Sequence, residues 1–108
     1  MSLYRFKSRE TGDLVMLEPS GKRILQILGK DPVNAGVIRH EEMAGAIEAL
    51  NTAAKADELA QQKMKDEAAA NGEPVPQFDA ISLRMRCAPF IEMLQRCLKA
   101  EVEVVWGV

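Results

Sequence analysis

Strand patterns stand at both ends of this 108-residue chain, and helix patterns fill the long stretch between them. Residues 3–7 alternate between two faces, with Tyr4 and Phe6 on one of them, and the apolar run Leu14–Leu17 follows a glycine-containing turn. This order predicts an antiparallel hairpin. The segment Val102–Trp106 alternates again. Since two strands alone are marginally stable, the C-terminal strand is expected to join the hairpin in one sheet.

Helical spacing predicts two helices after the hairpin. Ser20 is the predicted N-cap of the first helix, which ends at Gly29. The second begins at Glu41, and its apolar residues recur every three or four positions from Met43 to Ala54. Beyond Ala54 the apolar stripe weakens while helix propensity stays high, so the second helix is expected to continue as a solvated arm.

A third helix is predicted after Ser82, its N-cap, with apolar residues at helical spacing as far as Leu98. Pro89 lies inside this pattern and is expected to kink the helix. The alternative is a strand over Ile81–Cys87, with a helix that begins at Pro89.

The predicted order is β-β-α-α-α-β, which is an α+β fold with a small antiparallel or mixed sheet packed on about three helices. Residues 1–108 are expected to form a single domain, within which residues 66–79 are predicted to be a flexible linker. The segment Lys30–His40 is expected to be a connector, with Val37 and Ile38 turned into the core.

Charge and hydropathy exclude several classes of protein. Fourteen Lys and Arg against sixteen Asp and Glu give a net charge of −2, which lacks the basic footprint of a nucleic-acid binder. The longest apolar run, Leu14–Leu17, is far too short to span a membrane. Met1–Lys7 does not resemble a secretory signal. Cys87 and Cys97 would lie about 15 Å apart on one helix, too far for a disulfide, which favours a reducing cytoplasm.

Few residues suggest chemistry. Ser20, Gly21, Lys22 and Arg23 combine a predicted helix start with two cations, the arrangement that binds phosphate or another anion at a helix N-terminus. The full phosphate-loop spacing is absent, and an ordinary capped turn is the alternative. His40, the only histidine, adjoins Glu41 and is expected to lie at a helix start on the surface. No catalytic residue, metal site or cofactor is predicted.

Two predicted strands carry apolar residues on both faces, which helices on one side of a sheet do not cover. Val15, Leu17, Val105 and Trp106 are therefore candidates for an interface. Trp106 either pins the last strand to the core of its own chain or lies between subunits. Because twofold dimers are the commonest oligomers, we expect a homodimer in which a second copy covers the open face or edge of the sheet.

Several stretches also resemble a known family. They include the opening Leu3–Ser8, Met16–Gly21, Ser82–Leu94 and the closing Val105–Val108. Together they are similar to a family of short bacterial proteins known only as a domain of unknown function. The resemblance implies a cytoplasmic bacterial protein of about this size and supplies no activity.

The sequence leaves two classes of function open. The first is a small non-enzymatic interaction or adaptor protein of the cytoplasm, which acts as a homodimer and has neither a nucleic acid nor a membrane as its partner. The second is a protein that binds an anion or phosphate, or acts on a small molecule, at the helix start Ser20–Arg23.

Overall fold

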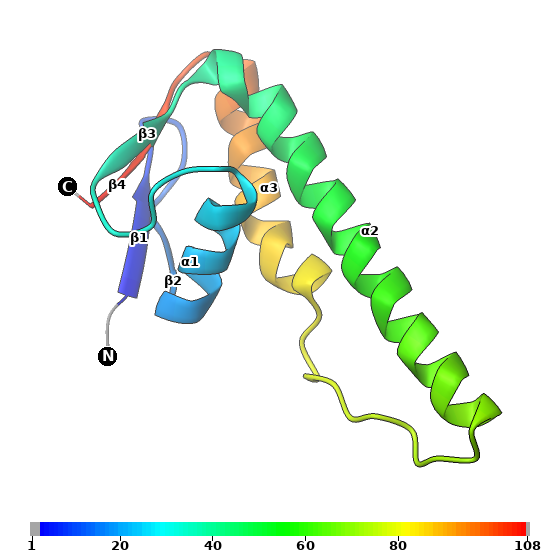
Figure 1. The fold of residues 1–108 in the computed structure, drawn as a ribbon. Coiled ribbons are helices and arrows are strands. Elements are labelled where there is room, and N and C mark those ends of the chain that lie inside the picture. The colour runs from blue at the N-terminus through cyan, green and yellow to red at the C-terminus, as the bar shows by residue number, and fades with distance from the viewer. Residues whose placement is uncertain (1–2, 108) are drawn as a thin grey trace.

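The computed structural model describes residues 3–107, so Met1, Ser2 and Val108 of the predicted terminal segments lie outside it. Within this range the fold is α+β, as predicted (Figure 1). In chain order the elements are β1 (Leu3–Lys7), β2 (Leu14–Leu17), α1 (Glu18–Ile27), β3 (Gly36–Ile38), α2 (His40–Ala70), α3 (Leu83–Ala100) and β4 (Val104–Trp106).

The strands form one antiparallel sheet in the order β2-β1-β4-β3. In the hairpin Leu3 lies opposite Leu17, and the last strand joins β1 through the pair Phe6 and Trp106. The prediction that the C-terminal strand meets the hairpin is confirmed. β4 therefore lies in the interior of the sheet, between the first strand of the chain and β3.

The segment Lys30–His40 was predicted as a connector only, and this prediction is wrong for its second half. Gly36–Ile38 forms β3 and pairs with β4, with Val37 opposite Val105. Three residues are too few to show an alternating pattern, and β3 depends on the edge that β4 offers it. Ile38 is fully buried, as expected.

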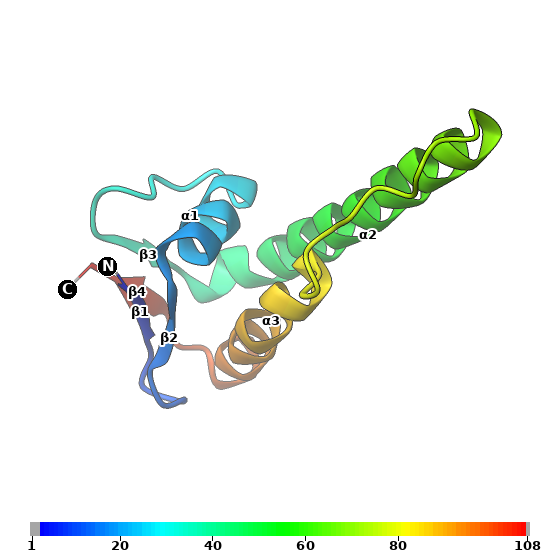
Figure 2. The ribbon, with the colours of Figure 1, turned by 90° about the horizontal axis from the view of Figure 1, so that it is seen from below.

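The helices all lie on one side of the sheet (Figure 2). Even-numbered residues of β1, β2 and β4 point toward the helices, and Phe6 lies at the centre of the core they form. The Phe6 ring meets Phe90 of α3 edge to face at 4.8 Å between centroids and lies 6.1 Å from the Trp106 ring. The opposite side of the sheet, called the outer face below, has no helix over it (Figure 2).

The predicted start of α1 was three residues late. The helix begins at Glu18, with Leu17 as its N-cap, and Ser20 lies within the first turn. Pro19 has the fixed φ that suits a first turn, and the carboxylate of Glu18 suits the positive end of the helix dipole. At the other end Gly29 has a φ of 72° and follows the helix as predicted.

α2 is a helix of 31 residues. The predicted extension beyond Ala54 is therefore present, and α2 ends at Ala70, so residues 66–70 of the predicted linker are helical. No helix or strand is assigned between Ala70 and Leu83. In Figure 1 the far half of α2 projects away from the sheet, and this connecting segment runs back beside it.

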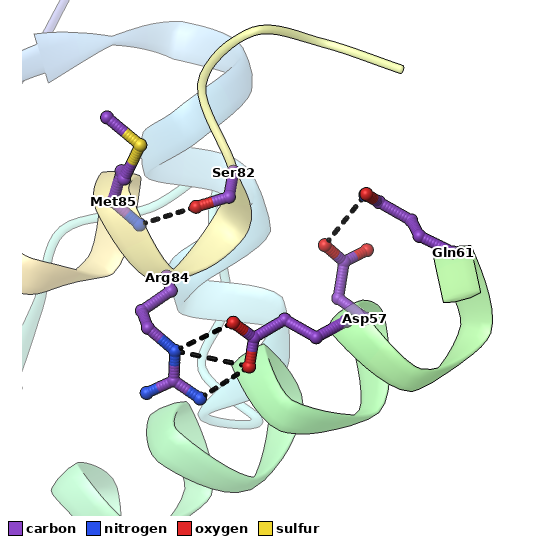
Figure 3. Close-up of polar contacts among 6 residues, drawn as sticks. Asp57, Gln61, Ser82, Arg84 and Met85 are labelled. Atoms are coloured by element: carbon purple, nitrogen blue, oxygen red, sulfur yellow. Dashed lines mark hydrogen bonds and ion pairs between the residues drawn. The ribbon is translucent and has the colours of Figure 1, made fainter. Parts of the chain in front are cut away.

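α3 is a continuous helix that contains Pro89, so the alternative strand over Ile81–Cys87 is not formed. Ser82 is its N-cap, as predicted, and its hydroxyl oxygen accepts a hydrogen bond from the Met85 N–H at 3.1 Å (Figure 3). Glu101 closes the helix in the left-handed region with a φ of 57°. This closure turns the chain directly into β4.

Candidate functional site

The outer face of the sheet is the candidate site, because apolar side chains are exposed there. Leu3, Val15 and Leu17 are 57%, 42% and 51% exposed. They adjoin one another, since Leu3 lies opposite Leu17 and Val15 is two residues along the same strand. We call these three residues the apolar corner. Isolated exposed hydrophobic side chains are common, but a contiguous group on a sheet with one bare side is typical of a contact surface.

Of the four predicted interface residues, Val15 and Leu17 belong to the apolar corner. Val105 is half-buried on the outer face, between Lys7 of β1 and Val37 of β3. Leu3 was not predicted as an interface residue, although its place opposite Tyr4 and Phe6 in the alternation of β1 was visible in the sequence. The outer face thus includes both hairpin strands as well as β4.

Trp106 lies on the other side of the sheet and is 3% exposed. Its indole Nε1–H donates to the backbone oxygen of Asn34 at 3.2 Å. Its ring also lies against Gly36, where a Cβ atom would come within 2.3 Å of Cζ2. Of the two predicted alternatives, the structure therefore shows packing within the chain.

Charged side chains occupy the centre of the outer face. Arg5 and Lys7 project from β1, the strand next to β2. The Arg5 guanidinium lies 3.4 Å from the carboxylate of Asp13, at a site where both side chains are well exposed to water. The outer face is therefore apolar toward β2 and cationic along β1.

A cavity of about 510 Å³ lies where the outer face ends, between the C-terminal end of β1 and the N-terminal ends of α2 and β4. Three basic and three acidic side chains line it, beside His40 and two valines; the full lining is Lys7, Ser8, Arg9, Arg39, His40, Glu41, Glu101, Val102, Glu103 and Val105. Sequence reasoning missed this cavity because three separate segments of the chain contribute to it. Because its positive and negative side chains are equal in number, the cavity has no net positive potential that would attract an anion.

The cavity also lacks a ready nucleophile. The Ser8 hydroxyl is hydrogen-bonded to the Thr11 hydroxyl at 2.8 Å and accepts from the Thr11 N–H at 2.9 Å, so it holds the hairpin turn together. His40 is the first residue of α2, and its Nδ1 lies 3.7 Å from a Glu41 carboxylate oxygen. The surface position predicted for His40 at a helix start is therefore observed.

The predicted anion-binding residues Ser20, Gly21, Lys22 and Arg23 point to different partners. Lys22 pairs with Glu18 at 2.6 Å, and this hydrogen bond and charge raise the pKa of the Lys22 amine. Arg23 reaches Asp57 of α2 at 3.4 Å. The Ser20 hydroxyl accepts from the Arg86 guanidinium at 2.9 Å, while Gly21 is buried against the ring of Tyr4. Anion binding there stays a prediction, with no convergence of these groups to support it.

The arginines of α3 are dispersed, as their spacing indicates. Arg84 forms three hydrogen bonds with Glu58 of α2, the shortest at 2.7 Å, and reaches across to that helix in Figure 3. Arg86 turns instead to Ser20 of α1. In Figure 3 Asp57 also receives a hydrogen bond from Gln61, one turn further along α2. These contacts tie the helices to one another and leave no basic patch on α3.

Both cysteines are buried in α3 and unpaired. Burial raises the pKa of the Cys87 thiol, with Arg23 and Arg84 opposing the shift, so this thiol is a poor nucleophile. Among residues 3–107, no three His, Cys, Asp or Glu side chains are grouped so as to hold a metal ion. In the same range no helix is both long enough and apolar enough to cross a membrane.

Comparison with known proteins gives one match. The family described as "Domain of unknown function (DUF1840)" matches residues 2–106, nearly the whole chain. Neither the curated proteins nor the solved structures yield a match. The resemblance seen in the strand and helix segments is thereby confirmed at the level of the family. Since the match covers far more than half of the sequence, this chain belongs to the DUF1840 family.

Proposed function

We propose that this chain is a small non-enzymatic interaction protein that acts as a homodimer through the outer side of its sheet. The observation that carries the proposal is the apolar corner formed by Leu3, Val15 and Leu17 on a sheet covered by helices on one side only. A second copy that covers these side chains would remove apolar surface from water, which is the main driving force for association. In such a dimer, every surface of the chain outside the contact would be present twice.

A cytoplasmic location is part of this proposal. Cys87 and Cys97 are both buried as free thiols, ten residues apart on one helix, which places them about 15 Å apart along its axis. Unpaired thiols persist in the reducing cytoplasm and are uncommon in secreted proteins of this size. The pairing of Lys22 and Arg23 with carboxylates favours this interaction role over the alternative, anion binding at Ser20–Arg23.

Light scattering combined with gel filtration tests the proposal. Wild-type protein is expected to approach twice its chain mass of 11.9 kDa as its concentration rises. Val15→Lys places a charge in the apolar corner and is expected to give a monomer with an unchanged circular dichroism spectrum. Val75→Lys is the matched control, because Val75 is 62% exposed in the connection between α2 and α3, away from the apolar corner.

Two results would contradict the proposal. One is a wild-type mass that stays at 11.9 kDa at tens of micromolar protein. The other is a Val15→Lys protein that dimerises as well as the Val75→Lys control, which would place any contact elsewhere on the molecule.

A further inference from the structure

We propose that the two copies join edge to edge through β2, antiparallel and with Met16 on the twofold axis, so that two four-stranded sheets become one sheet of eight strands. This inference rests on the proposed homodimer and specifies how it is built. It distinguishes an edge contact from the stacking of two outer faces. Three features of the described residues lead to it: the charges on β1, the composition of β2 and the pleat of the sheet.

The charges of β1 oppose stacking of the outer faces. Arg5 and Lys7 project from the middle of this face, and the pair formed by Arg5 and Asp13 is solvated. A second sheet laid over β1 would take these charges out of water, which costs more than an exposed ion pair returns. Charged side chains also protect exposed strand edges against pairing with other chains. Val15 and Leu17 lie on β2 at the edge of the sheet, with Arg5 and Leu3 as their cross-strand neighbours on β1.

The edge formed by β2 carries no such protection. β2 is the outermost strand, and its residues Leu14–Leu17 include no charge and no proline. Its two outward side chains, Val15 and Leu17, are both apolar and exposed. The opposite edge, β3, is shorter, and each of its three residues is at least half-buried. An unprotected strand edge has free backbone groups that another strand can pair with.

The pleat of the sheet restricts how β2 can pair with a copy of itself. Odd-numbered residues of β2 face outward and even-numbered ones face the helices. A continuous sheet must keep this alternation, so only registers that pair odd with odd and even with even are allowed. Two of these are centred within the strand. One places Met16 opposite the partner subunit's Met16, and the other places Val15 opposite the partner subunit's Val15.

Cross-strand pairing favours the first register. With Met16 on the axis, Val15 lies opposite the partner subunit's Leu17, and the reverse pair repeats on the other side of the axis. Both outward pairs are then apolar, and apolar cross-strand pairs stabilise a sheet. With Val15 on the axis, Leu17 would instead lie opposite the partner subunit's Asp13, a carboxylate already paired with Arg5 on the outer face. The first register has one such pair as well, Leu14 opposite the partner subunit's Glu18, but it lies on the side of the helices and leaves both outward pairs apolar. The first register also places the two apolar corners side by side across the new strand pair.

Disulfide cross-linking of variants that each carry one added cysteine tests the register in the full chain. Residues directly opposite in antiparallel strands lie about 4.5–5.5 Å apart between Cα atoms, within the span of a disulfide. Diagonal neighbours lie about 7–8 Å apart, beyond that span. Met16→Cys is therefore expected to form a covalent dimer under mild oxidation, at least about tenfold faster than Val15→Cys or Leu17→Cys. The native thiols of Cys87 and Cys97 are buried and give a low background.

Two further variants make the result independent of how well Met16→Cys folds. The double variant Val15→Cys with Leu17→Cys keeps Met16 and is expected to cross-link rapidly, because its thiols face each other in pairs. Val75→Cys, at an exposed position in the connection between α2 and α3, measures the rate of chance collisions. The proposal is supported if Met16→Cys and the double variant exceed this rate while Val15→Cys and Leu17→Cys match it.

The remaining outcomes overturn the inference in ways that separate it from the proposed function. Rapid cross-linking of Val15→Cys with slow cross-linking of Met16→Cys would show the other register. Chance-level rates for every variant, together with a wild-type dimer in light scattering, would show that the copies meet elsewhere than at β2. Chance-level rates with a wild-type monomer would overturn the homodimer itself.

Discussion

At the scale of single residues, two glycines are needed because aromatic rings lie directly on the backbone. A Cβ atom at Gly36 would lie 2.3 Å from Trp106 Cζ2, and one at Gly21 would lie 2.5 Å from Tyr4 Cγ. Both rings are held from their other ends, since Trp106 donates to Asn34 and the Tyr4 hydroxyl donates to the backbone oxygen of Pro32. The rings therefore have little room to move away from an added methyl group.

Gly36→Ala is expected to destabilise the fold by roughly 1–3 kcal/mol, the usual cost of overpacking a core. Gly45→Ala is the matched control, because Gly45 lies inside α2 with no atom within 4 Å of an added Cβ. Alanine there should stabilise the helix by about 0.5–1 kcal/mol. Urea denaturation measures both changes, and equal midpoints for the two variants would contradict the packing described for Trp106.

The sequence shows the burial of Trp106 but not what it packs against. A tryptophan in an alternating segment indicates a strand that carries a large apolar side chain, and it is found on the covered face. The glycine on which its ring lies is 70 residues away and has no distinguishing pattern around it. The same holds for Ser20, whose hydrogen bond to Arg86 joins α1 to α3.

At the scale of elements, α2 and α3 are linked at the surface by Glu58 and Arg84. The hydrogen bonds from the Arg84 guanidinium hold the pKa of Glu58 below its ordinary value of 4.5. Because the folded-state pKa is the lower one, this carboxylate stabilises the fold above the unfolded-state pKa. The contribution is lost as the pH falls through the folded-state pKa.

Glu58→Gln is therefore expected to lower the free energy of unfolding at pH 7, with the difference from wild type shrinking as the pH falls below about 4.5. Both side chains are solvated, so the effect at neutral pH is small and decreases with added salt. Glu48→Gln on the same helix is the control, since Glu48 has no ion pair within residues 3–107. A difference that stays constant from pH 7 to pH 3 would contradict the role given to Glu58.

Elements with a repeating pattern were predicted well, and those without one were not. About three helical turns of apolar spacing, from Met43 to Ala54, identify α2. Strict alternation identifies β4, although its first two predicted residues lie outside the strand. β3 has only three residues, and it forms because it can pair with β4. This pairing is a tertiary contact that no local sequence pattern reveals. The start of α1 was misplaced because Ser20 is a good capping residue, whereas Pro19 and Glu18 suit the first turn even better.

At the scale of the whole molecule, the connection between α2 and α3 is expected to be the first segment that a protease cuts. It has no helix or strand from residue 71 to 82, and most of its residues are exposed. Phe78 is its only aromatic residue, with Lys65 5.7 Å from the centre of its ring. Chymotrypsin should therefore cut after Phe78 before it cuts at the rings buried in the core.

The two fragments are expected to stay together, because α3 and β4 remain packed against α2 and the other strands. Mass spectrometry of the early products, with gel filtration of the nicked protein, measures both results. Phe78→Ser is the control that removes the preferred bond. An early cut next to Phe6, Phe90 or Trp106 would show that the core opens more readily than the connection.

The site was predictable in part for a reason that concerns the whole molecule. Apolar residues on both faces of Leu14–Leu17 indicated that helices on one side of the sheet would leave the apolar side chains of the other face uncovered. Val15 and Leu17 are indeed exposed there. The cavity beside the outer face was not predictable, since β1, β4 and the ends of α2 and α3 meet there only after the sheet has formed. Which charges stand beside the apolar corner likewise depends on the register of the strands.

The place of β4 has a consequence during synthesis. This strand is made last among the elements, yet it fills the position between β1 and β3. During synthesis, β1 of the hairpin and β3 have no strand between them until β4, which ends at Trp106, has left the ribosomal exit tunnel. Pairing between such distant residues is slow, and apolar surface stays open meanwhile. The sheet is thus expected to close in a single late step, once β4 has been made, and its open apolar surface is prone to aggregation until then.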